Sequence, residues 1–476
     1  MNAAVPGRVH FTTYGAPASP GYKIRVMDSK GAEKERKALA IASRLREKGF
    51  AAFFAGACVR DRILGVDPQD YDIATDARPQ VVQSLFDNTV AVGAAFGVIM
   101  VVVDGDPFEV TTFRAEAPYL DGRRPSAVRF GSLEEDALRR DFTIGGMYYD
   151  PTEDRFIDLV GGMRDLRAGI VRAIGNPYDR FAEDHLRILR AARFAARLDF
   201  AVDGATWVAM KRAAPMIKMI AAERVGEEMV MLMTEGGAAR GIDIMGECGL
   251  LGVLVPEVLE MVGCTQPENF HPEGDVYRHT RLALSMLPPG CSETVAFGML
   301  LHDIAKPQCR AVATDGKVTF YGHTDRGAEM AVEIMARLRR SRFVQERVAY
   351  LVRNHLRLCM APRMRPSTLK RMLVEVGFAE LMQVAFFDAF ASSSYLGFWH
   401  FCRRAMNRMT PAEIRPPRLI GGNDLIGLGF KPGPRFKAIL KEVEDLQLDG
   451  TLVSREQAVE YVLNHYAPSG NSPHAA

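Results

Sequence analysis

Residues 54–78 read FAGACVRDRILGVDPQDYDIATDAR and place a strand, a glycine turn, a short helix and a second strand in close succession. In the second strand Asp70 and Asp72 are one residue apart, so the alternation of strand side chains puts both carboxylates on one face, with Tyr71 and Ile73 facing the core. Two adjacent carboxylates raise each other's pKa unless a cation lies between them. Because hard divalent cations take oxygen ligands, the stretch predicts a magnesium site on Asp70 and Asp72.

A hairpin further along the chain is expected to supply a third acid. Residues 98–114, VIMVVVDGDPFEVTTFR, are typical of two strands joined by an Asp-Gly turn. Glu109 lies in the second of these strands, which can pair with the strand of the two aspartates. Three carboxylates around two metal ions suit phosphoryl transfer, in which one ion activates a hydroxyl and the other steadies the leaving pyrophosphate. The predicted catalytic residues are therefore Asp70, Asp72 and Glu109.

The glycine turn before the short helix is suited to binding a phosphate. Such a turn exposes backbone N–H groups to an anion, and Arg60 lies beside them in the same helix. The predicted nucleotide contacts are Gly56, Ala57 and Arg60. A lone Asp-x-Asp pair is more simply explained as a turn residue followed by a solvated one. The order of strand, glycine turn, arginine-bearing helix and Asp-x-Asp strand is far more specific.

The composition indicates the class of protein. The chain has 476 residues, too many for one compact core, with 48% hydrophobic residues, 25% charged residues and a net charge of +2. Any nucleic-acid-binding surface must therefore be local. Seven cysteines without a CxxC pair argue against a disulfide framework or a thiolate zinc site. The apolar run at residues 91–103 is too short to span a bilayer. We expect a cytoplasmic protein of several domains with no membrane partner.

The pattern of the chain changes near residue 175. Strand and helix signals alternate before it, whereas residues 177–410 are mostly of helical pattern and rich in Ala, Leu, Met and Arg. The predicted fold class is α+β, with an N-terminal mixed sheet and helices followed by all-helical regions. Residues 1–32, rich in Gly, Ala and Pro, are expected to form a flexible arm, and residues 467–476 a disordered tail.

Five motifs in fixed order resemble those of one family. They are FAGACVRDRILGVDPQDYDIATDAR (54–78), RRDFTIGGMYYD (139–150), DLVGGMRDL (158–166), EDHLRILRAARFAARLDF (183–200) and ERVGEE (223–228). The chain thereby resembles the class II tRNA nucleotidyltransferases and bacterial poly(A) polymerases. This resemblance implies a nucleotidyltransferase palm over residues 33–175 and a helical neck and RNA-binding body over 176–265. Ala57 replaces a glycine of the family's first motif and Gly145 an asparagine of its second, and both changes bear on efficiency or sugar discrimination.

The fourth motif has a physical explanation as a reader of bases. Adenine and cytosine share an exocyclic amino group beside an unprotonated ring nitrogen, where guanine and uracil present a carbonyl beside an N–H. A carboxylate and a guanidinium together therefore accept A and C and reject G and U. Asp184 and Arg187 are three apart on an expected helix, so they are neighbours. The resemblance implies the selecting role for them; without it, a surface ion pair of little value would be the simpler explanation.

Other arginines of the motifs are expected to contact phosphates. Arg190 and Arg193 continue the predicted helix and would face the triphosphate or the RNA. Arg140, in RRDFTI, resembles a triphosphate contact, braced by the neighbouring acid Asp141. A bare RRD cluster is common on protein surfaces, so these roles also depend on the resemblance.

A second group of candidate residues lies further along the chain, where six of the ten histidines fall between His271 and His400. Their order resembles the H…HD…D pattern of the HD phosphohydrolase superfamily and implies an HD domain over residues 266–410. The pattern residues are His279, His302, Asp303 and Asp388, with His323 and His355 between them. Imidazole and carboxylate ligands suit a divalent transition metal or magnesium, which activates water against a phosphoester. Any one of these histidines is more simply a core residue, but their conjunction favours a metal site.

These expectations together describe an enzyme that adds CCA to tRNA 3′ ends from CTP and ATP with Mg²⁺, and whose HD domain processes RNA ends. Residues 411–466 are expected to form a C-terminal helical unit that resembles the corresponding part of bacterial CCA-adding enzymes. The same motifs fit a poly(A) polymerase or an A-adding enzyme. An HD metal hydrolase with a degenerate, RNA-binding N-terminal domain is an alternative of another class, supported only by Ala57 and Gly145. The sequence does not indicate the oligomeric state.

Overall fold

The computed structural model describes residues 29–93, 97–115, 129–267, 271–392 and 395–466. The expected flexible arm lies outside this range up to residue 28, and so does the expected tail, 467–476. Helix α1 begins at Ser29, so the last residues assigned to the arm are helical. The chain forms two compact units: Met1–Ala168 with Arg172–Gly175, and Gly169–Val171 with Asn176–Ala476.

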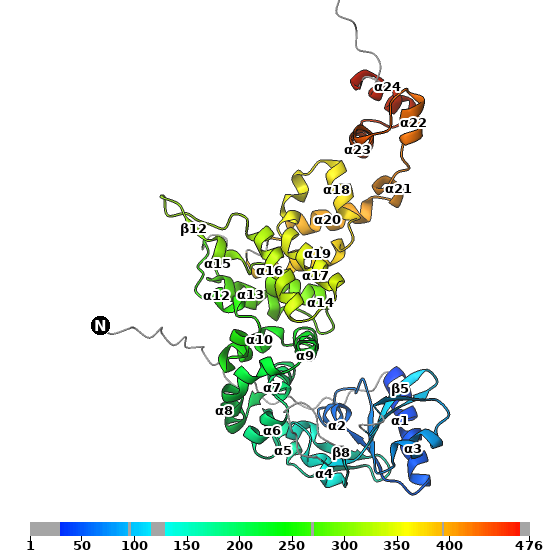
Figure 1. The fold of residues 1–476 in the computed structure, drawn as a ribbon, viewed down its shortest axis with the longest axis vertical. Helices are drawn as coiled ribbons and strands as arrows, with labels where there is room; N and C mark the ends of the chain where they lie inside the picture. The colour runs from blue at the N-terminus through cyan, green and yellow to red at the C-terminus, as the bar shows by residue number, and fades with distance from the viewer. Residues whose placement is uncertain (1–28, 94–96, 116–128, 268–270, 393–394, 467–476) are drawn as a thin grey trace, which may run out of the picture. The chain divides into compact units, whose positions relative to one another are not determined.

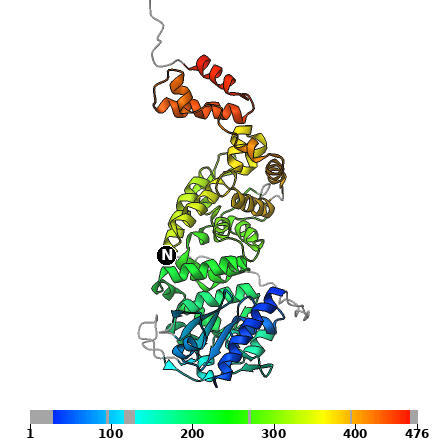
Figure 2. The ribbon, with the colours of Figure 1, turned by 90° about the vertical axis from the view of Figure 1, so that its right-hand side faces the viewer.

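The first unit is built on a mixed seven-stranded sheet (Figures 1 and 2). In spatial order its strands are β3 (Thr89–Gly93), β4 (Val98–Val103), β5 (Asp106–Thr112), β2 (Asp72–Thr75), β1 (Ala52–Ala55), β8 (Met147–Asp150) and β9 (Arg155–Asp158). Only the β2–β5 pair is parallel within this sheet. The unit also contains α1 (Ser29–Glu47), α2 (Ala57–Ile63), α3 (Pro79–Leu85), β6 (Arg114–Ala115), β7 (Arg129–Phe130), α4 (Leu133–Leu138), the 3₁₀ helix η2 (Thr143–Gly145) and α5 (Gly162–Ala168).

The predicted hairpin is confirmed. Val103 pairs with Asp106, so the two-residue turn is Asp104-Gly105, and both turn residues have positive φ (49° and 84°). This is the backbone that an Asp-Gly turn favours, because its twist matches that of the flanking strands. The hairpin fixes the register of β5 and thereby the position of Glu109 in the sheet.

The second unit is almost entirely helical, as predicted. Its neck and body comprise β10 (Ile170–Val171), α6 (Pro177–Glu183), α7 (Leu186–Leu198), β11 (Ala201–Val202), α8 (Gly204–Ala213), η3 (Ala214–Met219), α9 (Ala222–Thr234), α10 (Ala238–Cys248), α11 (Leu250–Leu254) and α12 (Glu257–Glu260). The following part comprises α13 (Val276–Ser285), α14 (Glu293–Leu301), α15 (Lys306–Cys309), β12 (Ala311–Val312), β13 (Val318–Thr319), α16 (His323–Arg337), α17 (Arg342–Asn354), η4 (Arg357–Arg363), α18 (Pro366–Leu373), α19 (Phe378–Ala391) and α20 (Gly397–Arg408). The chain ends with α21 (Pro411–Ile414), α22 (Gly422–Gly427), α23 (Pro434–Leu448) and α24 (Arg455–His465). The predicted α+β class is confirmed.

Helix α14 is the centre of the histidine-rich region. Its sequence ETVAFGMLL is apolar on every side, and all its residues from Thr294 to Leu301 are buried. Helices α9, α13, α17 and α19 pack around it (Figure 1). The chain leaves α14 at His302 and Asp303, so these two side chains are held in the interior by a fully buried helix.

Two glycines of the first unit, Gly162 and Gly145, differ in how closely the neighbouring atoms approach them, and this difference tests the packing of that unit. A Cβ on Gly162 would meet Met147 Cγ at 2.7 Å and approach the Thr143 carbonyl even more closely, whereas a Cβ on Gly145 has nothing within 4 Å. We predict that Gly162→Ala lowers the free energy of unfolding by about 1–3 kcal/mol because the crowded neighbours must move. Gly145→Ala serves as the control and should change it by less than about 0.5 kcal/mol. Equal thermal stabilities of the two variants would contradict this packing.

Candidate active sites

The first candidate site is a group of carboxylates on two adjacent parallel strands. Ile73 of β2 is in register with Val110 of β5, so the preceding residues Asp72 and Glu109 lie side by side. Asp72 opens β2, but Asp70 precedes the strand, and the prediction that both belong to one strand is wrong. Asp70 is 82% exposed at its side chain and pairs with Lys34 of α1, whose Nζ lies 2.7 Å from its carboxylate.

The electrostatics of Asp72 favour a cation. Burial, and after it the nearby charge of Glu109, raises the pKa of Asp72 from 3.8 to about 6, and Asp70 adds to the effect. An ionised carboxylate held in this environment lacks sufficient positive charge around it. Carboxylate oxygens are the ligands that Mg²⁺ prefers. The roles of Asp70, Asp72 and Glu109 as its ligands stay predictions.

The glycine turn lies against Asp72. Gly56 has φ 73° between β1 and α2, and a Cβ added to it would lie 3.1 Å from Asp72 Oδ2 and 3.8 Å from Arg140 Nη1. A side chain at Gly56 would therefore intrude where the carboxylate and the guanidinium converge. Ala57, the first residue of α2, is exposed, so its methyl group does not crowd the interior of the turn.

Arg60 is further from the solvent than predicted. Its residue is only 3% exposed, and its guanidinium donates to the carboxylate of the next residue, Asp61, at 2.7 and 2.9 Å. A nucleotide phosphate would have to compete with Asp61 for it.

Arg140 belongs to a hydrogen-bond network centred on Asp136, a residue that the sequence analysis did not single out. The buried Asp136 accepts hydrogen bonds from Arg139, Arg140 and the Tyr148 hydroxyl, and Arg140 also donates to the Gly145 carbonyl at 3.2 Å. Although burial opposes ionisation, the two arginines hold the pKa of Asp136 below its usual value. The spacing of Asp136 three and four residues before the arginines was the signal that could have identified it.

Asp141, the predicted brace of Arg140, is half-buried at the following position. Its backbone carbonyl accepts from the Ile174 N–H at 3.2 Å, which ties the second motif to the end of the first unit. The bracing role predicted for its carboxylate stays a prediction.

In the second unit, Asp184 and Arg187 do not lie on one helix, contrary to the prediction. Helix α6 ends at Glu183 and α7 begins at Leu186, and Asp184 lies between them with extended backbone (φ −143°, ψ 104°). Its carboxylate accepts from the Leu186 N–H at 3.0 Å. The physical reason is that aspartate side chains bind nearby backbone N–H groups and so favour the starts of helices over their interiors.

Each member of this pair has a charged partner that the sequence analysis did not single out. Arg224 donates to Asp184 at 2.9 Å, and Glu183 accepts from the buried Arg187 at 2.6 Å. Arg224 lies in ERVGEE and Glu183 opens EDHLR, so both belong to quoted motifs, but their roles depend on contacts across helices α6, α7 and α9.

Arg190 and Arg193 face the helix α9. Arg193 is buried and donates to Glu228 at 2.8 Å and to Glu235 at 3.2 Å. Arg190 is 35% exposed and its Nε lies 3.8 Å from Glu228. These contacts join α7 to α9, and the predicted contacts of both arginines with phosphates stay predictions.

The second candidate site unites all four predicted HD residues. His279 comes from α13, Asp388 from α19, and His302 and Asp303 directly follow α14. His279 Nε2 is 3.0 Å from Asp388 Oδ1 and 3.2 Å from His302 Nε2, and His302 Nε2 is 3.2 Å from Asp303 Oδ2. Segments far apart in the sequence thus converge on one buried point.

His323 and His355 also belong to this cluster. Their Nε2 atoms lie 3.5 and 3.6 Å from Asp303 Oδ1. In His302, His323 and His355 the Nδ1 atom donates to a backbone carbonyl at 2.7–2.8 Å, so the lone pair is on Nε2 and directed at the cluster. Glu273 similarly accepts from His279 Nδ1 at 2.6 Å. Such outer contacts orient histidines that bind metals.

The cluster contains polar atoms that the protein does not satisfy. Asp303 Oδ1 and His323 Nε2 are buried and make no hydrogen bond to any residue that the structure describes. Burial lowers the pKa of His355 to about 4, so its imidazole is neutral at pH 7. Despite burial, hydrogen bonds to Asp388 and Glu273 raise the pKa of His279 to about 9, so a metal that binds its Nε2 must displace a proton. Imidazoles and carboxylates directed at the same point are a donor set for divalent metal ions.

The possible ligand atoms form three sets. In the first, His271–Glu273–His279, the two Nδ1 atoms already lie within hydrogen-bond distance of Glu273, whereas His279–His302–Asp388 and Asp303–His323–His355 are two neighbouring sets.

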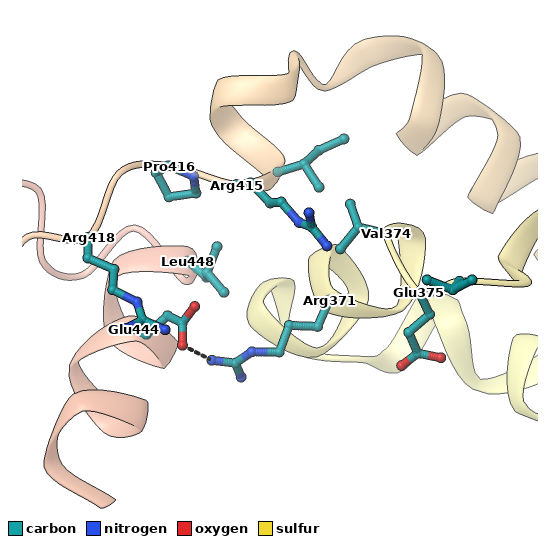
Figure 3. Close-up of a pocket in the computed structure, with 10 residues that line it drawn as sticks. Arg371, Val374, Glu375, Arg415, Pro416, Arg418, Glu444 and Leu448 are labelled. Atoms are coloured by element: carbon teal, nitrogen blue, oxygen red, sulfur yellow. Dashed lines mark ion pairs between the residues drawn. The ribbon is translucent and has the colours of Figure 1, made fainter. Parts of the chain in front are cut away.

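A surface pocket of about 500 Å³ lies beside α18, α21 and α23 (Figure 3). Arg371, Arg415 and Arg418 line it together with Glu375 and Glu444, and Arg371 is 3.4 Å from Glu444. This pairing neutralises part of the basic lining, and neither candidate site contributes a residue to it.

The pKa of Asp72 gives a test of the first site that needs no substrate. Because the folded-state pKa is above 3.8, the ionised side chain opposes folding, and the stability present below pH 3.8 is lost as the pH rises through about 6. We predict that Asp72→Asn stabilises the metal-free protein at pH 8 by up to about 3 kcal/mol, and about half as much at pH 5. Chemical denaturation in EDTA measures this, with the exposed Asp87→Asn as control. A gain that is the same at both pH values would contradict the burial of this charge.

Comparisons with known proteins agree with this organisation. Three family models match the chain: the poly A polymerase head domain over residues 52–172, the probable RNA and SrmB-binding site of polymerase A over 199–261, and the HD domain over 276–381. The CCA-adding enzyme of Ligilactobacillus salivarius is 44% identical over 208 residues, covering 44% of this chain and 51% of the relative. That of Bacillus licheniformis is 43% identical over 215 residues, covering 45% and 54%. The chain thus matches about half the length of these relatives.

Solved structures share the fold over most of the chain. The Bacillus stearothermophilus CCA-adding enzyme in complex with CTP has a TM-score of 0.67 at 25% identity and covers 90% of this chain and 96% of its own. The Thermotoga maritima CCA-adding enzyme complexed with tRNA has a TM-score of 0.55 at 20% identity, over 92% and 96%. Within the described ranges, no helix has the length and apolar character needed to cross a bilayer. Residues 52–172 therefore resemble a poly A polymerase head domain, and a region like the RNA-binding site of such polymerases and an HD domain follow it in the chain.

Proposed function

We propose that this protein adds CCA to the 3′ ends of tRNA from CTP and ATP without a template. The observation that carries the proposal is the pair Asp72–Glu109 on adjacent strands, facing the Gly56 turn and Arg140 within a poly A polymerase head domain. The matched relatives are named CCA-adding enzymes, and the solved neighbours include complexes with CTP, ATP and tRNA. We place the activity in the cytoplasm, where tRNA and nucleoside triphosphates are available together.

The residues of the first unit have separate roles in the proposed nucleotidyl transfer. Asp70, Asp72 and Glu109 would hold Mg²⁺, which activates the RNA 3′-hydroxyl and stabilises the charge of the leaving pyrophosphate. The Gly56 turn offers backbone N–H groups to the triphosphate, and Arg140, oriented by Asp136, supplies positive charge beside it. The hydroxyl oxygen attacks the α-phosphorus, a phosphodiester bond forms and pyrophosphate departs.

Base choice is assigned to Asp184 and Arg187 in the second unit. Their present partners, Arg224 and Glu183, keep both charges compensated while no base is bound. A cytosine or adenine offers an amino group to Asp184 and a ring nitrogen to Arg187, whereas guanine and uracil present the opposite pattern. The wrong bases would place a carbonyl oxygen against the Asp184 carboxylate and an N–H against the Arg187 guanidinium, and neither pair can form a hydrogen bond.

A poly(A) polymerase or an A-adding enzyme uses the same groups, and the names of the matched relatives favour CCA addition. The two departures from the family motifs do not support a degenerate N-terminal domain. Ala57 is exposed, Gly145 lies in open space, and neither touches the carboxylates.

The HD cluster supports a second activity. We propose that it holds two divalent metal ions, one on His279, His302 and Asp388 and one on Asp303, His323 and His355, and hydrolyses a terminal or 2′,3′-cyclic phosphate on RNA. The division of the ligand atoms into two adjacent sets supports this number. Two adjacent ions can orient a water and neutralise a phosphate together.

The two active sites can be separated by mutation. Asp72→Ala should reduce nucleotide addition by at least about 10³-fold, because it removes a proposed Mg²⁺ ligand. The same variant should hydrolyse phosphate like the wild type. His302→Ala should do the reverse. Primer extension and release of phosphate measure the two activities, with Asp87→Ala as a control. Full extension by Asp72→Ala would show that the metal assignment is wrong.

The number of ions in the HD cluster can be counted directly. Wild-type protein saturated with Mn²⁺ and freed of loosely bound metal should retain one more ion per chain than His355→Ala, which loses a ligand of the second set. Elemental analysis of the dialysed protein measures this, and the exposed His465→Ala is the control. Equal metal content of wild type and His355→Ala would contradict the second ion.

A further inference from the structure

The HD region carries a surface of unpaired positive charge. Between Asp388 and Glu413 the chain contains no acidic residue, and α20 lies in this interval. Its arginines Arg403, Arg404 and Arg408 are exposed, and none makes an ion pair with any residue in the described part of the chain.

The segment packed against α20 extends this charge. The 3₁₀ helix η4 contacts α20, and the chain around it contains no acidic residue between Glu346 and Glu375. Arg353 and Arg357 of this segment pair with acids from elsewhere, Asp325 and Glu375. By contrast Arg363 and Arg365 are exposed and have no carboxylate partner within the described ranges. We name the exposed arginines of α20, Arg403, Arg404 and Arg408, the α20 surface.

Aromatic side chains adjoin these arginines. Phe386 of α19 stacks against Phe390 at 6.0 Å and contacts Trp399 of α20 at 5.4 Å, and the Arg403 guanidinium lies 5.4 Å from the Trp399 ring. Phe390 is 49% exposed and Tyr395 is 69% exposed. Exposed aromatic rings that lie close together on a protein surface often mark a binding site.

The aromatic cluster also adjoins the HD metal ligands. Asp388 lies between Phe386 and Phe390 on α19, and its side chain is 15% exposed, whereas His279 and His302 are fully buried. Among the proposed metal ligands, Asp388 and His323, with 15% and 10% of their side chains exposed, are the ones nearest to solvent.

We propose that the α20 surface binds single-stranded RNA and presents its end to the HD site; this rests on the phosphohydrolase activity proposed above. Arginines without acidic partners neutralise phosphates, and exposed aromatic rings stack with unpaired bases. Duplex RNA would hide its bases and leave the rings unused. Asp388 is two residues from Phe390 on α19 and therefore lies on another face of this helix, so a strand stacked on Phe390 has to continue around α19 to bring its terminal phosphate to the metal ligands.

The test uses the full chain and a fluorescent single-stranded 12-mer RNA carrying 4-thiouridine. Irradiation of the wild type should cross-link the RNA to peptides of residues 386–404, and mass spectrometry locates the adducts, which separates this surface from other RNA sites of the chain. Arg403→Glu combined with Arg404→Glu should reduce these adducts at least about tenfold. Arg342→Glu, an equally exposed arginine of α17, should leave them unchanged.

Binding measured by fluorescence anisotropy adds a second criterion. The salt dependence of the dissociation constant should become shallower by about 0.7 in log–log slope for each phosphate that the double variant no longer neutralises. Phe390→Ala, an exposed position that should not affect folding, should weaken single-strand binding about fivefold or more. Adducts on the same peptides at wild-type levels in the double variant, or preferential cross-linking of duplex RNA to them, would overturn the proposal.

Hydrolysis distinguishes failure of this inference from failure of the HD proposal. The double variant should hydrolyse bis(p-nitrophenyl) phosphate like the wild type and show a raised KM for RNA with a 2′,3′-cyclic phosphate. If the wild type hydrolyses neither compound, the phosphohydrolase proposal fails, and with it the delivery of an end, while the cross-linking result still decides whether the surface binds RNA.

Discussion

The arrangement of Asp72 beside Glu109 is the constraint on which the first site depends. Parallel pairing of β2 with β5, in the register that sets Ile73 beside Val110, places the two acids next to each other. Burial, and after it the repulsion from Glu109, raises the pKa of Asp72, and the nearby Arg140 offsets only part of this rise. The ionised carboxylates lower the free energy of unfolding of the metal-free protein, and a divalent cation that binds them removes this cost.

The HD cluster follows the same principle with different ligands. A fully buried helix, α14, delivers His302 and Asp303 to the interior, and backbone carbonyls orient three imidazoles towards the same point. Asp303 Oδ1 and His323 Nε2 find no protein partner among the described residues. The HD cluster satisfies part of its polar groups internally, as in the contact between His279 and Asp388, and leaves Asp303 Oδ1 and His323 Nε2 for the metal ion that we propose.

The sequence predicted what depends on local pattern and missed what depends on contacts across elements. The hairpin, the glycine turn, the α+β class and the order H…HD…D are visible as spacings of residue types, and the structure contains all of them. Asp70 was misplaced because the strand starts two residues later, and Asp70 itself is exposed and pairs with Lys34 of a distant helix. Asp184 was misplaced because its side chain ends one helix and starts the next. The partners Asp136, Arg224 and Glu183 could be recognised only once the helices that bring them together were known.

The central claim is that the first unit adds a defined CCA sequence to tRNA, and the most direct measurement is sequencing of the product. A tRNA lacking its 3′ terminus is incubated with the protein, Mg²⁺ and each nucleoside triphosphate alone, then with CTP and ATP together. The account predicts that extension with both nucleotides stops after CCA, and that GTP and UTP are not incorporated. A long A tail, or A added only to tRNA that already ends in CC, would contradict it.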